Sequence, residues 1–425
     1  MAMPTRAAAS LPAHGPRESG RPLQSWGQRL AIVAAGLLLA WFSLAVTLGQ
    51  VVGTRRPGLV LRLGIDSATA KAAIAATLTK PGATGAEIAQ ANRLSREALR
   101  REPVNMIAAR TQAQLAALRN DRPAADKWFF YAERLSRRDL MTQLWLLERE
   151  VGRGNVTGAL THYDRALRVT RNARATLFPV LITASDDPVI ADALVPVLKR
   201  RPGWALDFVE VMTESPQASA RALATLAGRL GLDPASPVER TTLQKAINRL
   251  VTDKQFQEAS RLARTRQAVG VADGVYNGDF ERLPVLTPFD WMLIDGGEQS
   301  ATIEPRGSGS ALSLRTPHGS AGELARQLLL LEPGRHVITV GATGLGGAQS
   351  RGAELTLSCV DGPVIQKMPL TTASFTRLRA PALVPIDCPA QWLIIAAPLG
   401  LGDADQTLML DDIDIRPALP PSRGQ

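Results

Sequence analysis

The hydrophobic positions of the chain first gather in one uninterrupted run, LAIVAAGLLLAWFSLAVTLG, at residues 30–49. Such a run of about 20 residues without a charge is long enough to cross a bilayer as a helix. It is longer than the core of a typical signal peptide, and no convincing A-x-A cleavage site follows it. We therefore expect an uncleaved transmembrane anchor at residues 30–49, with a basic tail at residues 1–29 before it and a linker at residues 50–65 after it.

At residues 66–270 the pattern changes to apolar stretches of helical period, separated by short clusters rich in Gly, Pro, Asn and Asp. Four of these breaks read TKPGATG, RREPVN, RNDRP and GRGN. No run in this region alternates as a strand would. The pattern predicts an α-helical array of roughly ten helices, each of about 12–18 residues.

A period of 34 residues runs through the first half of this helical region. Three positions recur at this interval. The first is small (Ala91, Ala125 and Ala159), and so is the last (Ala98, Ala132 and Ala166). Between them lie Ser95, Phe129 and Tyr163. The pattern resembles the second helix of the tetratricopeptide repeat, whose period is 34. The resemblance implies paired helices that stack into a solenoid and bind protein partners in a groove. The alternative is a helical spacer, and beyond about residue 175 the fading period predicts degenerate or irregular hairpins.

After residue 270 the hydrophobic period becomes that of strands. Five runs show it: RHVITV, AELTLSCV, FTRLRAPALV, QWLIIAAP and TLMLDDIDI. Gly, Pro and Ser turns separate these runs, which predicts an antiparallel β-sandwich or jelly roll over residues 271–417 and a disordered tail at residues 418–425. Within AELTLSCV, apolar residues alternate with polar ones, so Cys359 is expected to point inward.

Several short motifs of this last region follow one another in a recognisable order: NGDFE at 277–281, Trp291, GSALSLR at 309–315, LLLLEPGRHVITV at 328–340 and LMLDDIDI at 408–415. The series resembles a carbohydrate-binding module of the galactose-binding-like jelly roll, over most of residues 273–417. The resemblance implies glycan binding, for which Trp291 and Trp392 are candidates because a flat indole can stack on the apolar face of a sugar. Core packing is the alternative for both tryptophans.

The same resemblance implies a structural calcium ion where the first and last strands meet. Carboxylates are the hard oxygen ligands that calcium prefers, and the candidates are Asp279, Glu281 and Asp412. An acidic strand end in contact with solvent is the alternative.

Formal charge divides at the same boundaries as the hydrophobic pattern. Residues 1–65 carry +6, residues 66–270 carry +10 and residues 271–425 carry −6, which gives the +10 of the whole chain. A basic middle and an acidic end indicate separate domains with separate partners, and we expect no nucleic acid among them.

Two cysteines, Cys359 and Cys388, lie in the β-rich region. They suggest a disulfide and an oxidising compartment, with two reduced, buried thiols as the alternative. Similar numbers of basic residues lie before and after the anchor, so the charges do not decide its orientation. We infer the orientation from the cysteine pair. We expect a single-pass protein of the bacterial inner membrane with a cytoplasmic N-terminus and a periplasmic body.

Common catalytic motifs are absent from the sequence: it contains no P-loop, nucleophile elbow, H-E-x-x-H or dinucleotide fingerprint, and only four histidines. We predict a non-catalytic accessory or scaffold protein for synthesis or export of a cell-surface polysaccharide. The helical array would bind protein partners and the jelly roll would bind glycan. The alternative is a protein-only assembly scaffold whose sandwich is a docking face, and a degenerate glycan-processing enzyme is a third hypothesis.

Overall fold

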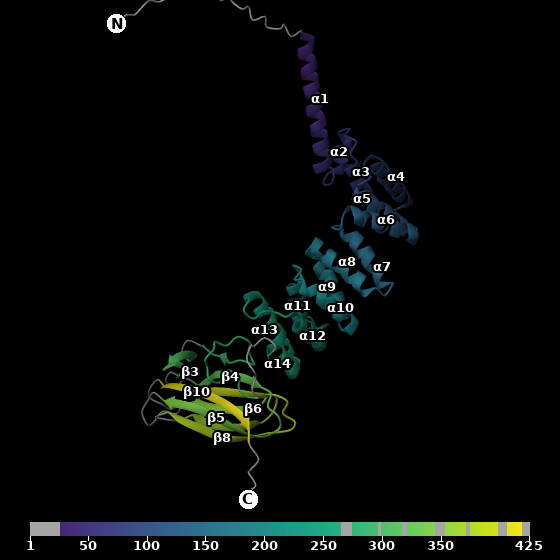
Figure 1. The fold of residues 1–425 in the computed structure, drawn as a ribbon. Helices are drawn as coiled ribbons and strands as arrows, with labels where there is room; N and C mark the ends of the chain where they lie inside the picture. The colour runs from purple at the N-terminus through teal and green to yellow at the C-terminus, as the bar shows by residue number, and fades with distance from the viewer. Residues whose placement is uncertain are drawn as a thin grey trace, which may run out of the picture. The chain divides into compact units, whose positions relative to one another are not determined.

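The computed structural model describes residues 26–264, 274–295, 299–316, 321–344, 353–370, 375–397 and 406–418. Within these ranges fourteen helices precede ten strands (Figure 1), which confirms the predicted order of a helical region and a C-terminal antiparallel sandwich. The chain divides into two compact units, Met1–Arg137 and Arg138–Gln425. Most of the expected N-terminal tail, and all but the first residue of the expected C-terminal tail, lie outside the described residues.

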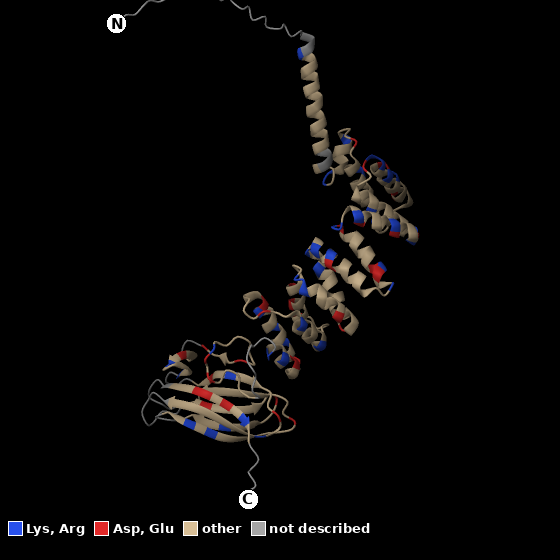
Figure 2. Ribbon diagram, viewed as in Figure 1, with Lys and Arg blue, Asp and Glu red and all other residues tan. Residues whose placement is uncertain are grey.

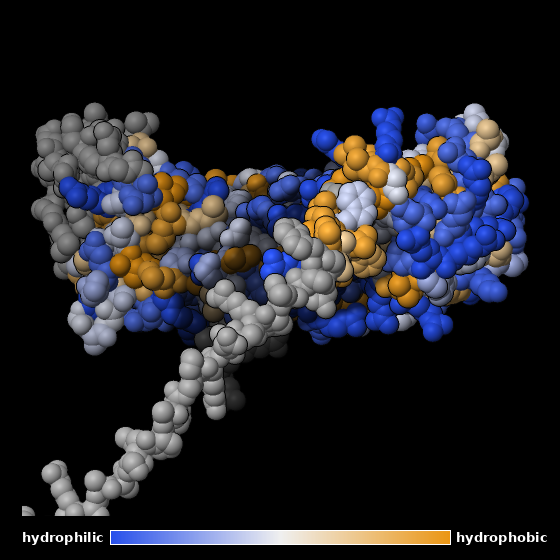
Figure 3. Space-filling view, turned by 90° about the horizontal axis from the view of Figure 1, so that it is seen from above, coloured by the Kyte–Doolittle hydropathy of each residue, from blue (hydrophilic) through white to orange (hydrophobic). Residues whose placement is uncertain are grey.

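Helix α1, Trp26–Val51, contains the apolar run. Of the helices in the described ranges, it alone is long and apolar enough to cross a membrane, over Arg29–Thr47. Its large apolar side chains are exposed, and hydrophobic side chains gather where this helix is viewed along its axis (Figure 3). Exposed apolar side chains on all sides of a helix are costly in water and suited to lipid. A membrane anchor and a signal sequence both have these properties.

The first compact unit continues with short helices that pack in antiparallel neighbours: α2 Pro57–Arg62, α3 Ala68–Thr77, α4 Gly85–Arg101, α5 Met106–Leu118 and α6 Arg122–Leu135. Helix α3 packs on α4 and α5, and α5 packs on α6. Helix α4 begins at a capping box, in which the Thr84 side chain accepts from the Glu87 N–H and the Glu87 carboxylate accepts from the Thr84 N–H. Reciprocal caps of this kind satisfy backbone donors that a helix start leaves open.

The second unit opens with eight more helices: α7 Leu140–Val151, α8 Val156–Val169, α9 Asn172–Ala184, α10 Pro188–Lys199, α11 Ala205–Glu214, α12 Ala220–Leu230, α13 Pro237–Thr252 and α14 Phe256–Arg264. Helix α8 contacts α10, α10 contacts α12, and α12 contacts α14, so every second helix stacks on the next. Twelve helices, α3 to α14, therefore stand where the pattern predicted roughly ten. Helical pairs continue to Arg264 although the 34-residue period fades near residue 175.

The repeat positions lie buried on the second helix of each pair, namely α4, α6 and α8: Ala91, Ser95, Ala98, Ala125, Phe129, Ala132, Ala159, Tyr163 and Ala166. The helix caps repeat at the same interval. Asn105 and Asp139 each accept a backbone N–H three residues on, and Asp121 and Asn155 do the same one helix later. A cap every 34 residues fixes where each helix begins, and small buried residues let the paired helices approach closely.

The strands form two five-stranded sheets, antiparallel throughout, with the order β1-β4-β9-β6-β7 in one and β2-β3-β10-β5-β8 in the other. Their bounds are β1 Met292–Leu293, β2 Ser300–Arg306, β3 Gly309–Thr316, β4 Gly322–Leu329, β5 Gly334–Gly344, β6 Ala353–Cys359, β7 Val364–Leu370, β8 Thr376–Val384, β9 Gln391–Ala397 and β10 Gln406–Pro417. Alternate residues of β6 and β9 are buried between the sheets, as the period of two predicts. We call the two sheets the β9 sheet and the β10 sheet.

The predicted disulfide is present. Cys359 ends β6 and Cys388 lies just before β9, with an S–S distance of 2.11 Å and a Cα–Cα distance of 5.5 Å. Both cysteines are buried, and Cys359 points inward as the alternation of its strand predicts. The bridge joins the end of one central strand to the start of its neighbour in the β9 sheet.

The outer face of the β9 sheet is not free. Leu286, Phe289 and Leu328 of the sandwich belong to the same buried apolar cluster as α13 and α14. The Lys254 ammonium, just after α13, lies 2.7 Å from the Asp361 carboxylate at the β6–β7 turn. The last helices and the β9 sheet therefore share one core within residues 138–425, which leaves the outer face of the β10 sheet as the open side of the sandwich.

Candidate functional site

The NGDFE motif forms a closed turn at the start of the sandwich. Asn277 and Phe280 both have φ of 52°, a region that Asn tolerates and an aromatic residue rarely adopts. The Asn277 amide closes the turn, since its Nδ2 donates to the Arg282 carbonyl at 2.7 Å and its Oδ1 accepts from the Arg282 N–H at 3.2 Å. These two hydrogen bonds therefore hold the backbone of Arg282 next to Asn277.

Gly278 lets this segment lie directly against β10. The Ile413 N–H donates to the Gly278 carbonyl at 2.9 Å. A Cβ atom at Gly278 would stand 1.9 Å from the Ile413 carbonyl oxygen, and one at Gly274 would stand 2.6 Å from that of Ile415. From the other sheet, the buried Gln327 amide bonds to both the N–H and the carbonyl of Tyr276, at 2.9 and 2.8 Å. The segment at residues 274–282 is thus tied to both sheets.

Phe280 and Trp291 anchor the segment in the core. Their ring centroids lie 5.4 Å apart, and both side chains are 0% exposed. The Trp291 indole N–H donates to the Asn277 carbonyl at 3.1 Å. Trp291 as a glycan-stacking residue is therefore wrong for this structure, because a fully buried ring offers no face to a sugar and its one polar group is already used.

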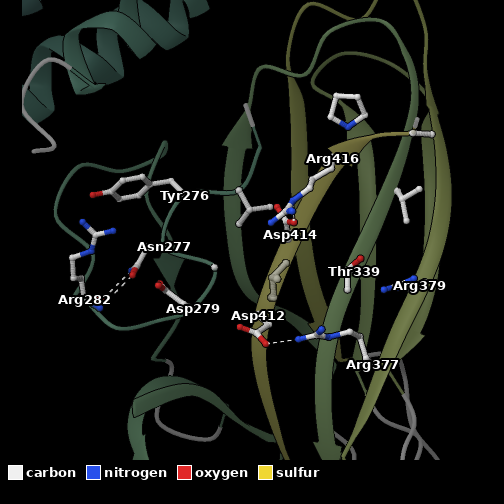
Figure 4. Close-up of a pocket in the computed structure, with 16 residues that line it drawn as sticks. Tyr276, Asn277, Asp279, Arg282, Thr339, Arg377, Arg379, Asp412, Asp414 and Arg416 are labelled. Atoms are coloured by element: carbon white, nitrogen blue, oxygen red, sulfur yellow. Dashed lines mark hydrogen bonds and ion pairs between the residues drawn. The ribbon is translucent and has the colours of Figure 1, made fainter. Parts of the chain in front are cut away.

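A cavity of about 750 Å³ lies between this segment and the outer face of the β10 sheet. Figure 4 shows Tyr276, Asp279 and Arg282 on one side and Arg377 and Arg379 of β8 on the other. The remaining lining residues come mostly from β5 and β10: Val275, Asn277, Gly278, Val337, Thr339, Asp412, Ile413, Asp414, Arg416, Pro417 and Ala418. The cavity is open and has both polar and apolar residues in its lining, and we call it the β10 pocket.

A β-bulge brings the acidic residues of β10 to this outer face. Asp411 pairs with Gly341 and Asp414 with Thr339, so three residues of β10 span two of β5. The extra residue, Asp412, has a φ of 49°. A bulge re-aims the side chain at the extra position and raises the local twist. The sequence DDID can therefore present three carboxylates outward while Ile413 stays buried.

Two of the arginines at the pocket are neutralised within it. Arg377 donates to the Asp412 carboxylate at 2.7 Å, and Arg416 pairs with Asp414. Arg379 has no carboxylate partner among the residues that the structure describes, and on the opposite wall Asp279 has no cationic partner in those ranges. Figure 2 shows acidic residues along β10 and basic residues along β8. Arg282, on the same wall as Asp279, also has no carboxylate partner in those ranges. Among the described residues the pocket thus offers an unpaired arginine on the β8 wall, and an unpaired arginine and an unpaired carboxylate on the facing wall.

The remaining wall residues combine an aromatic ring with a charge. The Arg282 guanidinium carbon lies 5.2 Å from the centroid of the Tyr276 ring, within the range of a cation–π contact. Burial raises the pKa of the Tyr276 phenol, so this hydroxyl stays protonated and able to donate. Burial also raises the pKa of Asp411, against the lowering effect of the Asp412 N–H that its carboxylate accepts.

The second tryptophan candidate, Trp392, lies on the outer face of the β9 sheet. It is half-buried, packs against the helical cluster, and has the Arg326 guanidinium carbon 4.8 Å from its ring centroid. The Trp392 ring does not offer an exposed face to a sugar, because helices and an arginine cover much of it.

Two of the three calcium candidates, Asp279 and Asp412, line the β10 pocket, where Asp412 pairs with Arg377. Glu281 instead accepts the Ser310 N–H at 2.9 Å, at the start of β3. Within the described ranges no three His, Cys, Asp or Glu side chains gather in a way that could hold a metal ion. The structural calcium stays a prediction from the sequence resemblance.

Sequence reasoning missed the arginine wall and Tyr276. A usable signal was present in TRLRA, since Arg377 and Arg379 are two residues apart on a strand and must share a face. Leu378 between them is half-buried and packs against the core between the sheets, which leaves the arginines on the outer side.

A second cavity, of about 490 Å³, lies on the first compact unit between α4 and α6. The rings of Trp128 and Tyr131 meet edge to face at 6.0 Å, and the Tyr131 hydroxyl donates to the Pro103 carbonyl at 2.9 Å. Phe130 is partly exposed beside them, and the rim is basic. The full lining is Leu99, Pro103, Lys127, Trp128, Phe130, Tyr131 and Arg134.

Comparison with known proteins gives a likeness in solved structures only. No protein-family model matches the chain, and no curated protein matches it. The β-sandwich resembles carbohydrate-binding modules. A family 4 module is 17% identical, covering 34% of this chain and 99% of its own with a TM-score of 0.27. A family 61 module in complex with β-1,4-galactotriose is 13% identical, covering 35% and 100%, with a TM-score of 0.26. The N-terminal cellulose-binding domain of Cellulomonas fimi β-1,4-glucanase C is 19% identical, covering 36% and 99%, with a TM-score of 0.24.

Proposed function

We propose that this chain is a non-catalytic, membrane-anchored scaffold of the bacterial periplasm that binds glycan through the β10 pocket. Its role is in the synthesis or export of a cell-surface polysaccharide. Helix α1 is the anchor, and the disulfide suits an oxidising compartment on the far side of the inner membrane. The helical array is tetratricopeptide-like and captures protein partners. The function therefore lies in holding a polymer and its machinery together at the membrane.

The β10 pocket is the observation that carries this proposal. It is an open hollow of about 750 Å³ with Asp, Arg, Thr and Tyr side chains at its walls and floor. Sugars are recognised by dense hydrogen bonding from such groups, and carboxylates and guanidinium groups can each engage two hydroxyls at once. The pocket lies on the β10 sheet, whereas α13 and α14 pack on the β9 sheet.

The partner-binding part of the proposal draws on the aromatic cavity between α4 and α6. Trp128, Phe130 and Tyr131 offer apolar contact area at low entropic cost, and Lys127 and Arg134 set a positive rim. This combination fits an apolar segment with acidic flanks on another protein of the same assembly.

The rival function is a protein-only scaffold. The observation in its favour is that one sheet of the sandwich is already a docking face, since the β9 sheet packs on α13 and α14. In that case the β10 pocket would take a polar segment of a partner protein, and no saccharide.

The two functions separate in a glycan-array measurement on the full chain in lipid nanodiscs, with and without calcium. Thr339 on the pocket floor is replaced by Trp to fill the hollow, and Thr302, an exposed strand residue of β2 outside the pocket, is replaced by Trp as the matched control. We expect glycan binding that Thr339→Trp abolishes and Thr302→Trp preserves. Binding that survives Thr339→Trp would place the site elsewhere, and no binding by a folded chain to any glycan would favour the protein-only scaffold.

A further inference from the structure

We propose that the β10 pocket selects acidic glycans, with the carboxylate of an acidic sugar bound by Arg379. This inference rests on the proposed glycan-binding function and specifies its ligand class. It follows from the distribution of paired and unpaired charges around the pocket.

The Arg379 side chain is the available cation of the β8 wall. It projects outward from an edge strand of the β10 sheet, opposite Thr339, and is exposed. Its neighbour Arg377 is held by Asp412, whereas no acidic group in the described ranges lies within ion-pair distance of Arg379. A planar guanidinium binds a carboxylate through two parallel N–H···O bonds, which is stronger and more directional than its contact with a neutral hydroxyl.

The shape of the floor leaves room for a ring next to Arg379. Thr339 of β5 lies between Arg379 of β8 and Asp414 of β10. Its side chain is small and lines the pocket, and adjacent strands lie about 4.8 Å apart. A pyranose can therefore rest on the floor with a substituent reaching the β8 wall.

The facing wall carries Asp279 together with Arg282, whose guanidinium lies over the Tyr276 ring. Asp279 is exposed and unpaired among the described residues, so its carboxylate can accept from sugar hydroxyls but repels a carboxylate. The Tyr276 ring lies beside Arg282 with its hydroxyl pointing away from β8 (Figure 4). An acidic sugar therefore binds with its acid group toward Arg379 and with hydroxyls toward Asp279.

Because the domain around the pocket has a negative net charge, recognition of an acidic glycan must come from direct contacts within the pocket. Residues 271–425 carry a formal charge of −6, so the domain as a whole does not attract polyanions. Selectivity for an acidic glycan then depends on direct contact with an arginine. Arg379 is exposed on the β8 wall whereas Arg282 lies against the Tyr276 ring, so removal of Arg379 should abolish the selectivity. A contact of this type is expected to change affinity by about 10-fold to 100-fold.

Matched pairs of ligands and variants test the inference on the full chain in nanodiscs. The ligands are oligogalacturonate, oligoalginate and hyaluronan oligosaccharides, each compared with its carboxyl-methylated form, which keeps the backbone and removes the charge. The variant is Arg379→Gln. The control is Arg315→Gln, an exposed arginine on β3 that does not line the pocket. Dissociation constants are measured by isothermal calorimetry at low and at physiological salt, and poly-glutamate serves as a competitor.

We expect at least one acidic oligosaccharide to bind about 10-fold or more tightly than its ester, with the difference lost in Arg379→Gln and kept in Arg315→Gln. Equal binding of acid and ester, or binding of neutral glycans only, would overturn the inference and leave the proposed function intact. No binding of any glycan would overturn both. Displacement of the sugar by poly-glutamate at comparable concentration would show that the pocket takes acidic peptides, which also overturns the inference.

Discussion

The contact between Gly278 and β10 makes a sharp prediction about how the pocket wall is held. In Gly278→Ala the new Cβ would stand 1.9 Å from the Ile413 carbonyl oxygen, whereas real Cβ contacts are essentially never shorter than 3.0 Å. The segment must therefore move away from β10 by at least about 1 Å, since no packing compresses so far. The Ile413 N–H to Gly278 carbonyl bond, now 2.9 Å, would then stretch beyond hydrogen-bonding length.

The expected cost combines two terms. Overpacking of a tight site costs about 1–3 kcal/mol, and a buried donor left without its acceptor costs about 1–3 kcal/mol more. We therefore expect Gly278→Ala to lower the free energy of unfolding of the sandwich by about 2–6 kcal/mol. Because domains are stable by about 5–15 kcal/mol, the variant should still fold, but with the pocket wall displaced.

The measurement is chemical denaturation of the full chain in nanodiscs, followed by Trp fluorescence, since Trp291 packs on the same turn. Gly203→Ala is the matched control, because a Cβ at Gly203 meets nothing within 4 Å and its φ lies outside the left-handed region. Denaturation midpoints that coincide for Gly278→Ala and the control would refute the account of the turn. So would glycan affinity that is unchanged in Gly278→Ala despite lost stability, because the wall would then not shape the pocket.

Two further predictions concern the sandwich. Replacing Cys359 and Cys388 by Ser, or reducing the wild type, opens a loop of sequence separation 29. On the chain-entropy model the free energy of unfolding should fall by about 3–4 kcal/mol, measured by denaturation with and without reductant. Equal unfolding free energies would mean that the bridge does not constrain the unfolded chain. Burial raises the pKa of Asp290 in the folded protein above its ordinary 3.8. The protonated carboxyl therefore adds to the free energy of unfolding below pH 3.8, and this addition is lost as the pH rises through the raised pKa. Relative to Asp290→Asn, the wild type should therefore gain stability as pH falls from about 7 to about 4, and parallel curves of unfolding free energy against pH would contradict this.

Much of the fold could be predicted because its signals are local. The apolar run of α1 and the strand runs of β5, β6, β8, β9 and β10 depend on spacing within a few residues, and these are found where the pattern placed them, whereas β7 was not predicted. The inward direction of Cys359 followed from the alternation of β6 in the same way. The later helical pairs, α9 to α14, were harder, because their buried faces vary in composition while the fold needs only that they be apolar.

The site could not be predicted to the same degree because it depends on contacts between distant segments. Asp412 and Arg377 are 35 residues apart and meet only because β5 lies between β10 and β8. The bulge at Asp412 does leave a mark in the sequence, because the apolar alternation through Leu408 and Leu410 resumes out of phase at Ile413 and Ile415 after two consecutive aspartates. What the bulged residue faces is known only from the register. Trp291 was equally undecided, because an indole suits both a core and a sugar platform and only the position of Phe280 settles which it is.

The two hypotheses that the sequence left open, a glycan-binding module and a docking face, need not compete for one surface. A sandwich has two outer faces, and here they differ in what covers them. The β9 sheet carries Trp392 and Leu328 against the helices, an apolar contact of the kind that joins domains. At the β10 pocket the other sheet carries charged side chains and the Thr339 hydroxyl beside apolar residues such as Val337, a mixture that suits a polar ligand. Since both candidate tryptophans are engaged in packing, recognition at the β10 pocket would have to come from hydrogen bonds and charge, and this is why the proposed selectivity is placed on Arg379.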